Sequence, residues 1–130
     1  MLLAPVRDFI RRLGDRHPVD GIVYDPKFFE DSAQDLSDEG FTLIELPQNG
    51  TAMADAYQDF YRKIGEGLIV HDADPVFADH VTAAVATKSD RGWKLRKLKS
   101  TEAGPGKRID ALVAAVMAEA MVGAQSVAPW

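Results

Sequence analysis

Apolar residues at helical spacing give the clearest pattern in the chain, over Lys107–Met121. Those on one face are Ile109, Leu112, Val113, Val116, Ala120 and Met121. This period predicts an amphipathic helix, and the alanines between these positions keep it narrow enough to pack closely against a sheet. Asp110 falls in its first turn, where the positive end of a helix favours a carboxylate without requiring any function.

Four earlier segments are also predicted to be helical. They are Pro5–Arg16, Pro26–Glu39, Thr51–Ile64 and a helix that opens at Asp74-Pro75, where Asp is a favoured cap and Pro a favoured first residue. The inner face of this last helix would carry Val76, Phe77, Val81 and Val85. Alternatively, Val85–Thr87 pairs with Trp93–Leu98 as a β-hairpin.

Three short apolar runs between these helices predict strands: Gly21–Tyr24, Phe41–Leu46 and Leu68–Val70. Strands joined by helices run parallel and cross over in the right-handed sense. The expected class is α/β, with a small, mostly parallel sheet of about three strands plus the candidate hairpin, flanked by helices.

Composition narrows the class of protein. The 130 residues suit a single domain, 1–130, and 46% hydrophobic with 27% charged residues is typical of a globular chain. The lack of cysteine excludes disulfides and thiolate metal sites and fits a reducing compartment. The apolar run Met1–Val6 ends too early for a signal peptide or a membrane span, so we expect a soluble, cytoplasmic protein.

Charge is concentrated in one segment. The net charge of −5 argues against a general nucleic-acid binder. Residues 88–108, however, carry 8 basic residues against only Asp90 and Glu102. The basic ones are Lys88, Arg91, Lys94, Arg96, Lys97, Lys99, Lys107 and Arg108. This segment suits contact with a phosphate backbone, or equally a solvated hairpin whose lysines keep its edge soluble.

Few motifs point to chemistry. The chain lacks GxxxxGK[ST], GxGxxG and HExxH, and its three histidines do not share metal-ligand spacing. His80 is expected to be a hydrogen-bonded core or rim residue. Asp25 follows the first predicted strand, at the end where ligands of open α/β sheets bind. Its alternative role is to cap the next helix.

The order of these pieces resembles the C-terminal nuclease domain of phage terminase large subunits, a ribonuclease H-like fold. Two family features match candidate acids: an Asp after a hydrophobic strand matches Asp25, and an Ile-Asp pair opening an alanine-rich last helix matches Ile109-Asp110. Gln48 matches a family glutamine after the second strand. The matching stretches are GIVYDP, LPQNGTAMADAYQDFYRKIGEGLIVHDADPVFADHVTAAV and KRIDALVAAVMA.

The resemblance implies a metal-dependent endonuclease that cuts concatemeric viral DNA during packaging by two-metal phosphodiester hydrolysis. Asp25 and Asp110 would be the catalytic metal ligands, because Mg²⁺ or Mn²⁺ is a hard ion that prefers carboxylate oxygens. The basic residues that would hold double-stranded DNA are Lys94, Arg96, Lys97, Lys99, Lys107 and Arg108.

The chain also departs from the family pattern. The family places a further carboxylate on an earlier strand, preceded by an ATPase motor, and often has an Asn near Ala83–Ala84. We therefore expect a partial ribonuclease H-like fold, encoded by a phage or prophage in a bacterial host cell, that cuts DNA poorly alone. Candidates for a third ligand are Asp15, Asp20 and Asp72.

Two further expectations follow from these departures. A separate terminase chain, supplying the ATPase or the upstream nuclease part, or self-association would cover the open edge of the Gly21–Tyr24 strand. The alternative function is a non-catalytic, prophage-derived α/β module that binds DNA or a partner and keeps both acids as structural caps.

Overall fold

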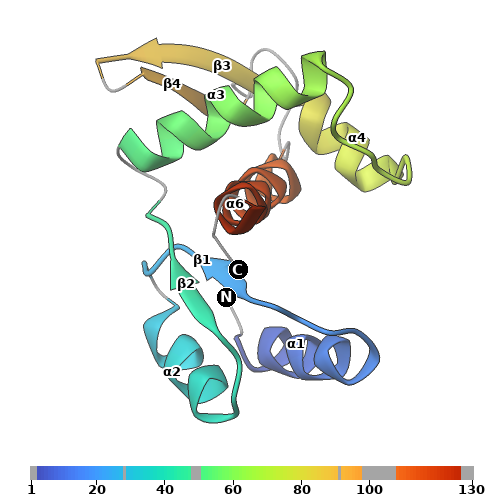
Figure 1. Ribbon diagram of the computed structural model, residues 1–130, viewed down its shortest axis with the longest axis vertical. Coiled ribbons are helices and arrows are strands. Elements are labelled where there is room, and N and C mark those ends of the chain that lie inside the picture. The colour runs from blue at the N-terminus through green and yellow to red at the C-terminus, as the bar shows by residue number, and fades with distance from the viewer. Residues whose placement is uncertain (1–2, 28, 48–50, 91, 98–107, 127–130) are drawn as a thin grey trace. The chain divides into compact units, whose positions relative to one another are not determined.

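The computed structural model describes residues 3–27, 29–47, 51–90, 92–97 and 108–126 (Figure 1). The chain divides into two compact units, Met1–Gln48 and Asn49–Trp130. Organisation as a single domain over residues 1–130 stays a prediction. Among the described residues, no helix combines the length and apolar character needed to cross a membrane.

A pair of parallel strands forms the centre of the first unit. Strand β1 (Ile22–Tyr24) aligns with β2 (Leu43–Glu45), with Ile22 opposite Leu43 and Tyr24 opposite Glu45. Helix α2 (Glu30–Asp38) lies between them in the chain and packs on β2, as a parallel crossover requires. The predicted pairing of the first two strands is therefore confirmed.

Helix α2 begins later than the sequence pattern predicts. The Asp25 carboxylate accepts a hydrogen bond from the Lys27 backbone N–H at 2.9 Å, which closes a turn at Pro26. Phe29 occupies the N-cap position of α2, so the alternative role of Asp25 as the cap of this helix is wrong. The buried face of α2 consists of Ser32, Ala33 and Leu36.

Helix α1 (Ala4–Arg16) is held by polar contacts. Arg7 donates to the hydroxyl of the fully buried Ser32 at 3.0 Å, and Arg11 pairs with Glu39 at 2.7 Å. Helix α1 has apolar residues at helical spacing, but Val6, Phe9 and Leu13 remain exposed and no residue of the helix is buried.

The described residues of the second unit form three helices and an antiparallel hairpin. The helices are α3 (Thr51–Gly65), α4 (Pro75–Thr82) and α6 (Asp110–Ser126). In the hairpin, β3 (Ala84–Ser89) pairs with β4 (Gly92–Lys97) from Ala84 opposite Lys97 to Ser89 opposite Gly92. This confirms the hairpin alternative, since α4 ends at Thr82 and Val85 belongs to β3.

The prediction of a third strand over Leu68–Val70 is wrong. These residues lie in an irregular segment after Gly67, whose φ of +71° turns the chain at the end of α3. Val70 is 92% exposed, so the apolar run is not buried between neighbouring strands. The described strands therefore form one parallel pair and one antiparallel pair instead of a three-stranded parallel sheet.

The core of the second unit lies where α6 packs on α3 and α4. The predicted face of the last helix is confirmed at its N-terminal half, although within this unit it meets helices instead of a sheet. Its buried residues are Ile109, Leu112, Val113, Val116 and Met117. They lie with Met53, Ala54, Ala56 and Phe60 of α3 in this core.

An ion pair links the two longer helices of the second unit. Lys63 of α3 donates to the Glu119 carboxylate of α6 and also pairs with Asp59 at 3.0 Å. The hydrogen bond to Glu119, followed by that to Asp59, raises the pKa of Lys63. The Lys63 side chain is only 14% exposed, so this pair joins α3 and α6 at the edge of their packed interface.

Candidate functional site

Asp25 lies directly after β1, at the carboxyl end of the parallel pair. It is half-buried, and its Oδ1 atom is engaged by the Lys27 amide. Beside it, the Tyr24 hydroxyl donates to the Glu45 carboxylate at 3.2 Å, and burial together with Glu45 raises the pKa of Tyr24. Asp25 therefore occupies the predicted strand end, in a turn held by its own side chain.

Asp110 is the first residue of α6, and it is exposed. The residue before it, Ile109, is only 6% exposed, and the Ile109 carbonyl accepts the first intrahelical hydrogen bond, from Val113 at 3.0 Å. The Ile-Asp pair thus has two roles: Ile109 anchors the start of the helix in the core, and Asp110 carries its carboxylate at the surface.

His80 contacts the same helix end. Its Nδ1 atom accepts a hydrogen bond from the Ala111 backbone N–H at 2.8 Å. The side chain lies in the last turn of α4 and is half-buried. The expectation of a hydrogen-bonded core or rim histidine is confirmed, but its partner at the start of α6 was not foreseen.

The two candidate carboxylates belong to different units, Asp25 to the first and Asp110 to the second. Their association at one metal site therefore stays a prediction. Carboxylate oxygens suit Mg²⁺ or Mn²⁺, so the donor chemistry fits. Across the ranges that the structure describes, no three His, Asp or Glu side chains are grouped so as to hold a metal ion. The residues present therefore fit part of a metal site.

The substitutes expected for a third ligand lie apart along the chain. Asp15 and Asp20 are exposed residues of the first unit. Asp72 belongs to the second unit and accepts a hydrogen bond from the Asp74 backbone N–H at 3.1 Å. Among the described residues of either unit, no group of three His, Asp or Glu side chains forms around Asp25 or Asp110.

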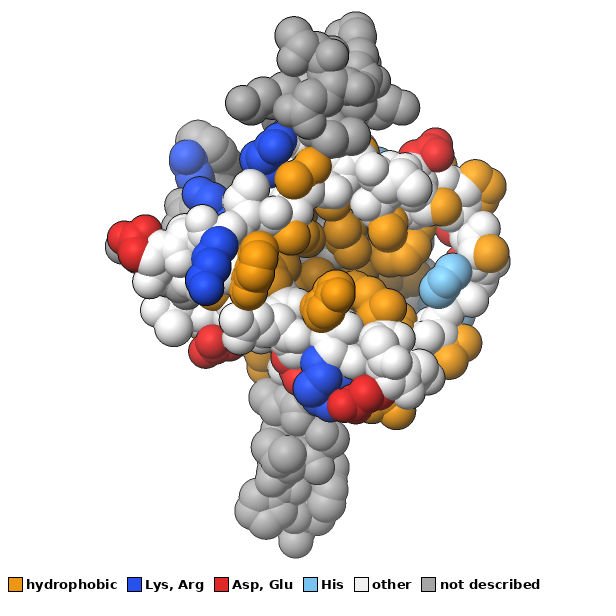
Figure 2. All heavy atoms as spheres, turned by 90° about the horizontal axis from the view of Figure 1, so that it is seen from above, with side chains coloured by type: hydrophobic (Ala, Val, Ile, Leu, Met, Phe, Trp, Pro, Cys, Tyr) orange, Lys and Arg blue, Asp and Glu red, His pale blue; other side chains and the backbone are white. Residues whose placement is uncertain are grey.

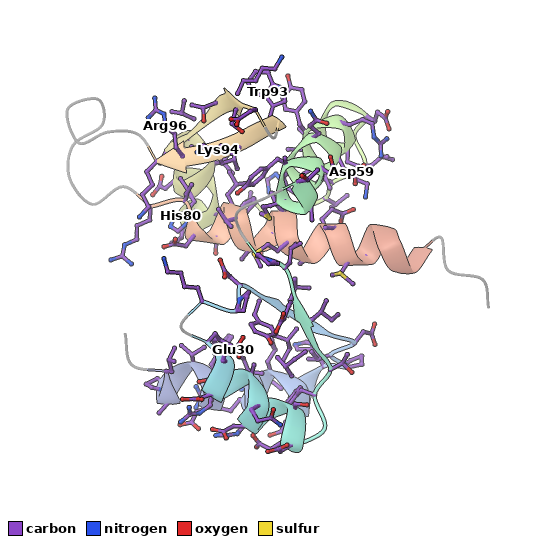
Figure 3. All side chains as sticks on the ribbon, turned by 90° about the vertical axis from the view of Figure 1, so that its left-hand side faces the viewer. Glu30, Asp59, His80, Trp93, Lys94 and Arg96 are labelled. Carbon is purple, nitrogen blue, oxygen red and sulfur yellow. The ribbon has the colours of Figure 1, made fainter. Side chains whose placement is uncertain are left out.

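The basic residues with described positions gather on the hairpin (Figure 3). Lys94 and Arg96 share one side of β4 by strand alternation, and Arg96 donates to the Lys97 carbonyl at 2.9 Å. Arg108 is exposed just before α6, whereas Lys99 and Lys107 lie outside the described residues.

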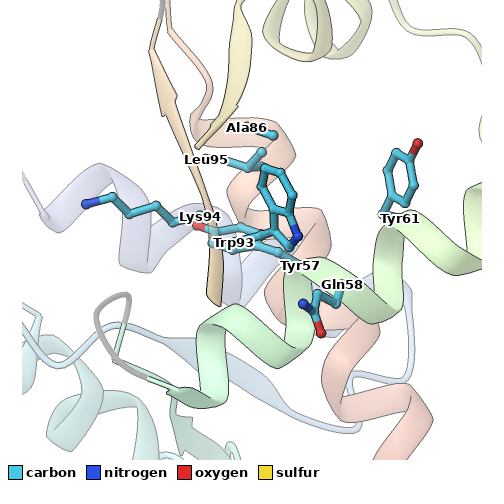
Figure 4. A pocket seen from close by; sticks show the side chains of 7 residues that line it. All are labelled: Tyr57, Gln58, Tyr61, Ala86, Trp93, Lys94 and Leu95. Carbon is cyan, nitrogen blue, oxygen red and sulfur yellow. The ribbon is translucent and has the colours of Figure 1, made fainter. Parts of the chain in front are cut away.

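An apolar groove of about 490 Å³ lies between the hairpin and α3. Its lining includes Tyr57, Tyr61, Trp93 and Leu95, and burial raises the pKa of Tyr57. The hydrophobic side chains form a hollow in Figure 2, and in Figure 4 Lys94 extends away from Trp93 and the tyrosines. Lys94 and Arg96 therefore lie on the face of β4 opposite Trp93 and Leu95, whereas Lys97 and Lys88, which pairs with Trp93, share the aromatic face.

The fold matches the crystal structure of the HK97 bacteriophage large terminase with a TM-score of 0.71 and 23% identity, covering 89% of this chain and 24% of that one. The arrangement of helices and strands is therefore that of a phage terminase nuclease, a partial ribonuclease H-like α/β fold. The family model described as "Terminase large subunit, endonuclease domain" matches residues 3–125, and the chain belongs to this family.

These matches confirm the predicted family resemblance and fold class. The chain spans about a quarter of the length of the HK97 protein, and the likeness to that structure concerns the fold. No curated protein sequence is detectably similar to this chain.

Proposed function

We propose that this chain is the metal-dependent endonuclease part of a phage terminase, which cuts concatemeric viral DNA during packaging. The observation that carries the proposal is membership of the terminase endonuclease family over residues 3–125. The chemistry of the two aligned acids supports it, because Asp25 and Asp110 supply the hard oxygen ligands that Mg²⁺ or Mn²⁺ requires.

Each residue has a distinct task in this proposal. Buried Ile109 fixes the start of α6, so Asp110 presents its carboxylate from a rigid helix end. Asp25 presents its carboxylate from a closed turn. Bound divalent ions would supply activation of water and neutralisation of charge on the phosphate.

Contact with DNA is assigned to the basic residues of β4 and of the segment just before α6. Lys94, Arg96 and Lys97 provide cationic groups spaced along one strand, and Arg108 adds another next to Asp110. Lys99 and Lys107 are proposed to join them. Such contacts are sequence-independent, because they engage the phosphate backbone, and they weaken steeply as salt increases.

The site is proposed to need a partner for full activity. Among the described strands, β1 pairs only with β2, so one edge of β1 has no strand beside it. A separate terminase chain or a second copy of this one would cover that edge and supply a further carboxylate. Light scattering after size exclusion tests the second-copy form, which predicts a mass above 14.2 kDa that rises with concentration.

Metal-dependent melting is the first test. A ligand that binds only the folded chain stabilises it by about 2.7 kcal/mol at 100 times its Kd, so Mn²⁺ should raise the Tm of the wild-type chain. Asp25→Asn and Asp110→Asn should each reduce that rise. Asp55→Asn, at an exposed position of α3, is the matched control and should keep it. An identical rise in all four proteins would contradict the assignment of these ligands.

Plasmid nicking is the second test. With Mn²⁺ or Mg²⁺, the wild-type chain should nick supercoiled DNA slowly, and Asp110→Asn should abolish the nicking. Cleavage that persists undiminished in Asp110→Asn would remove the proposed role of Asp110. Rapid cleavage by the chain alone, dependent on Asp110, would remove the need for a partner.

The alternative is a non-catalytic module that binds DNA or a partner. The observation in its favour is that no three metal-binding side chains are grouped in the described part of the chain. It predicts salt-dependent DNA binding by the hairpin without any Mn²⁺-induced rise in Tm.

A further inference from the structure

The first turn of α6 has no cap of its own. In most helices a Ser, Thr, Asp or Asn at the N-cap accepts a hydrogen bond from one of the first amides. Here the N-cap position falls to Ile109, whose carbonyl accepts from Val113 and whose side chain has no polar atom. The leading amides of α6 must therefore be satisfied from elsewhere.

His80 supplies the missing acceptor from another helix. Its Nδ1 atom takes the Ala111 N–H at 2.8 Å, across 31 residues of chain. Because Nδ1 accepts, the ring proton resides on Nε2. Figure 3 shows His80 at the end of α6 from which that helix begins.

The helix that carries His80 is itself well anchored. Asp74 caps α4 by accepting from the Val76 and Phe77 amides at 2.8 and 3.0 Å, and Pro75 occupies the first position of α4. Helix α4 packs on α6 in the core of the second unit. His80 therefore acts on the start of α6 from a rigid support.

The hydrogen bond acts on the peptide unit of the candidate metal ligand. The Ala111 N–H belongs to the peptide that joins Asp110 to Ala111, and this peptide is planar. Holding its N–H fixes the plane that contains the Asp110 Cα atom, and so limits where the Asp110 carboxylate can point. Metal ligands need such support, because a site works only within about 0.5 Å of its productive geometry.

We infer that His80 is a positioning residue for Asp110, acting through the Ala111 amide. This inference rests on the proposed role of Asp110 as a metal ligand. The rival explanation is that His80 stabilises the helix without affecting the carboxylate. The two differ in one measurable quantity, the affinity of the folded chain for a divalent ion.

Four variants of the full chain separate these explanations, the fourth being His80→Ala. His80→Phe keeps a ring but removes the Nδ1 acceptor. His80→Asn retains an acceptor, because the Oδ1 atom of Asn is bonded to Cγ as Nδ1 is in His. His71→Phe is the matched control, because His71 also accepts a backbone N–H through Nδ1 at 3.0 Å, but from Ala73 in its own loop instead of from α6.

Amide exchange and Mn²⁺ affinity are the readouts. By NMR, exchange of the Ala111 amide should accelerate at least tenfold in His80→Phe and stay near wild type in His80→Asn and His71→Phe. The Kd for Mn²⁺, from the dependence of Tm on its concentration, should rise about tenfold in His80→Phe alone, as expected when support of a metal ligand is lost.

Each outcome decides the matter. Faster Ala111 exchange with an unchanged Mn²⁺ Kd in His80→Phe would overturn the positioning role while leaving the proposed function intact. Absence of Mn²⁺ binding by the wild-type chain would overturn both. His80→Ala is measured in parallel, so a folding failure of His80→Phe does not remove the comparison with His80→Asn.

Discussion

Shortening Val116 to alanine measures how much the buried face of α6 contributes to stability. Val116 is 1% exposed in the core of the second unit, whereas Val122 on the same helix is 57% exposed. Val116→Ala and the control Val122→Ala each remove two methyl groups, and each such group stabilises the fold by about 0.8 kcal/mol when it is buried. The cavity left at Val116 adds to this, so Val116→Ala should cost roughly 2–3 kcal/mol.

Val122→Ala provides the control for helix propensity. Alanine is the better helix former by about 0.5 kcal/mol, and this gain applies at both positions. At Val122 the substitution removes little buried surface, so the free energy of unfolding of Val122→Ala should change by less than about 0.5 kcal/mol.

Urea unfolding followed by tryptophan fluorescence is the appropriate assay. Trp93 belongs to β4 in the unit that contains α6, so a change in its emission reports unfolding of that unit. Equal losses of stability at Val116 and Val122 would refute the assignment of the buried face. A loss confined to Val116 would support it.

Two more predictions concern stability. Gly92→Ala should lower the free energy of unfolding by about 1–3 kcal/mol in the same assay, because φ at Gly92 is +111° and a Cβ atom there would lie 3.2 Å from the Ala54 Cβ. Gly65→Ala is the control and should be nearly neutral, because a Cβ atom at Gly65 meets nothing within 4 Å. Pairing with Arg11 holds the pKa of Glu39 below its usual 4.5. The stability that the Arg11–Glu39 pair provides is therefore present above pH 4.5 and is lost as the pH falls through the lowered pKa of Glu39. The Tm by circular dichroism should therefore decline below about pH 4.5, and less steeply in Arg11→Met, whereas parallel declines would contradict this account.

Local sequence signals were sufficient where burial and periodicity agreed. The runs around Ile22 and Leu43 are separated by a helix, and they form the parallel pair that this order requires. The buried face of the last helix follows its 3.6-residue period from Ile109 to Val116. In both places the local pattern and the tertiary packing favour the same structure.

The same signals failed where an apolar run had no neighbour. Leu68–Val70 has strand-like composition, but a strand needs a partner to accept its backbone hydrogen bonds, and this segment follows a left-handed glycine at the surface. Similarly, Val6, Phe9 and Leu13 of α1 recur at helical spacing but are exposed. Periodicity reports which residues share a face and says nothing of what covers that face.

The candidate site was predictable in part. Asp25 and Asp110 follow from their places at a strand end and a helix start, together with the family resemblance. His80 could not be found this way, because its acceptor role depends on α4 packing beside α6. Nothing in the residues around His80 indicates a partner 31 positions away.

The way α1 is held makes part of the first unit sensitive to ionic strength. Its polar contacts with α2 and the adjoining turn come from Arg7 and Arg11, and the Arg11 pair is about two-fifths exposed. At 1 M salt the Debye length falls to about 3 Å, which screens exposed pairs of this kind. The α6 core, built from apolar side chains, would be strengthened by a salt such as sulfate that is excluded from protein surfaces. Concentrated sulfate should therefore stabilise the α6 core of the second unit while weakening the attachment of α1 in the first unit.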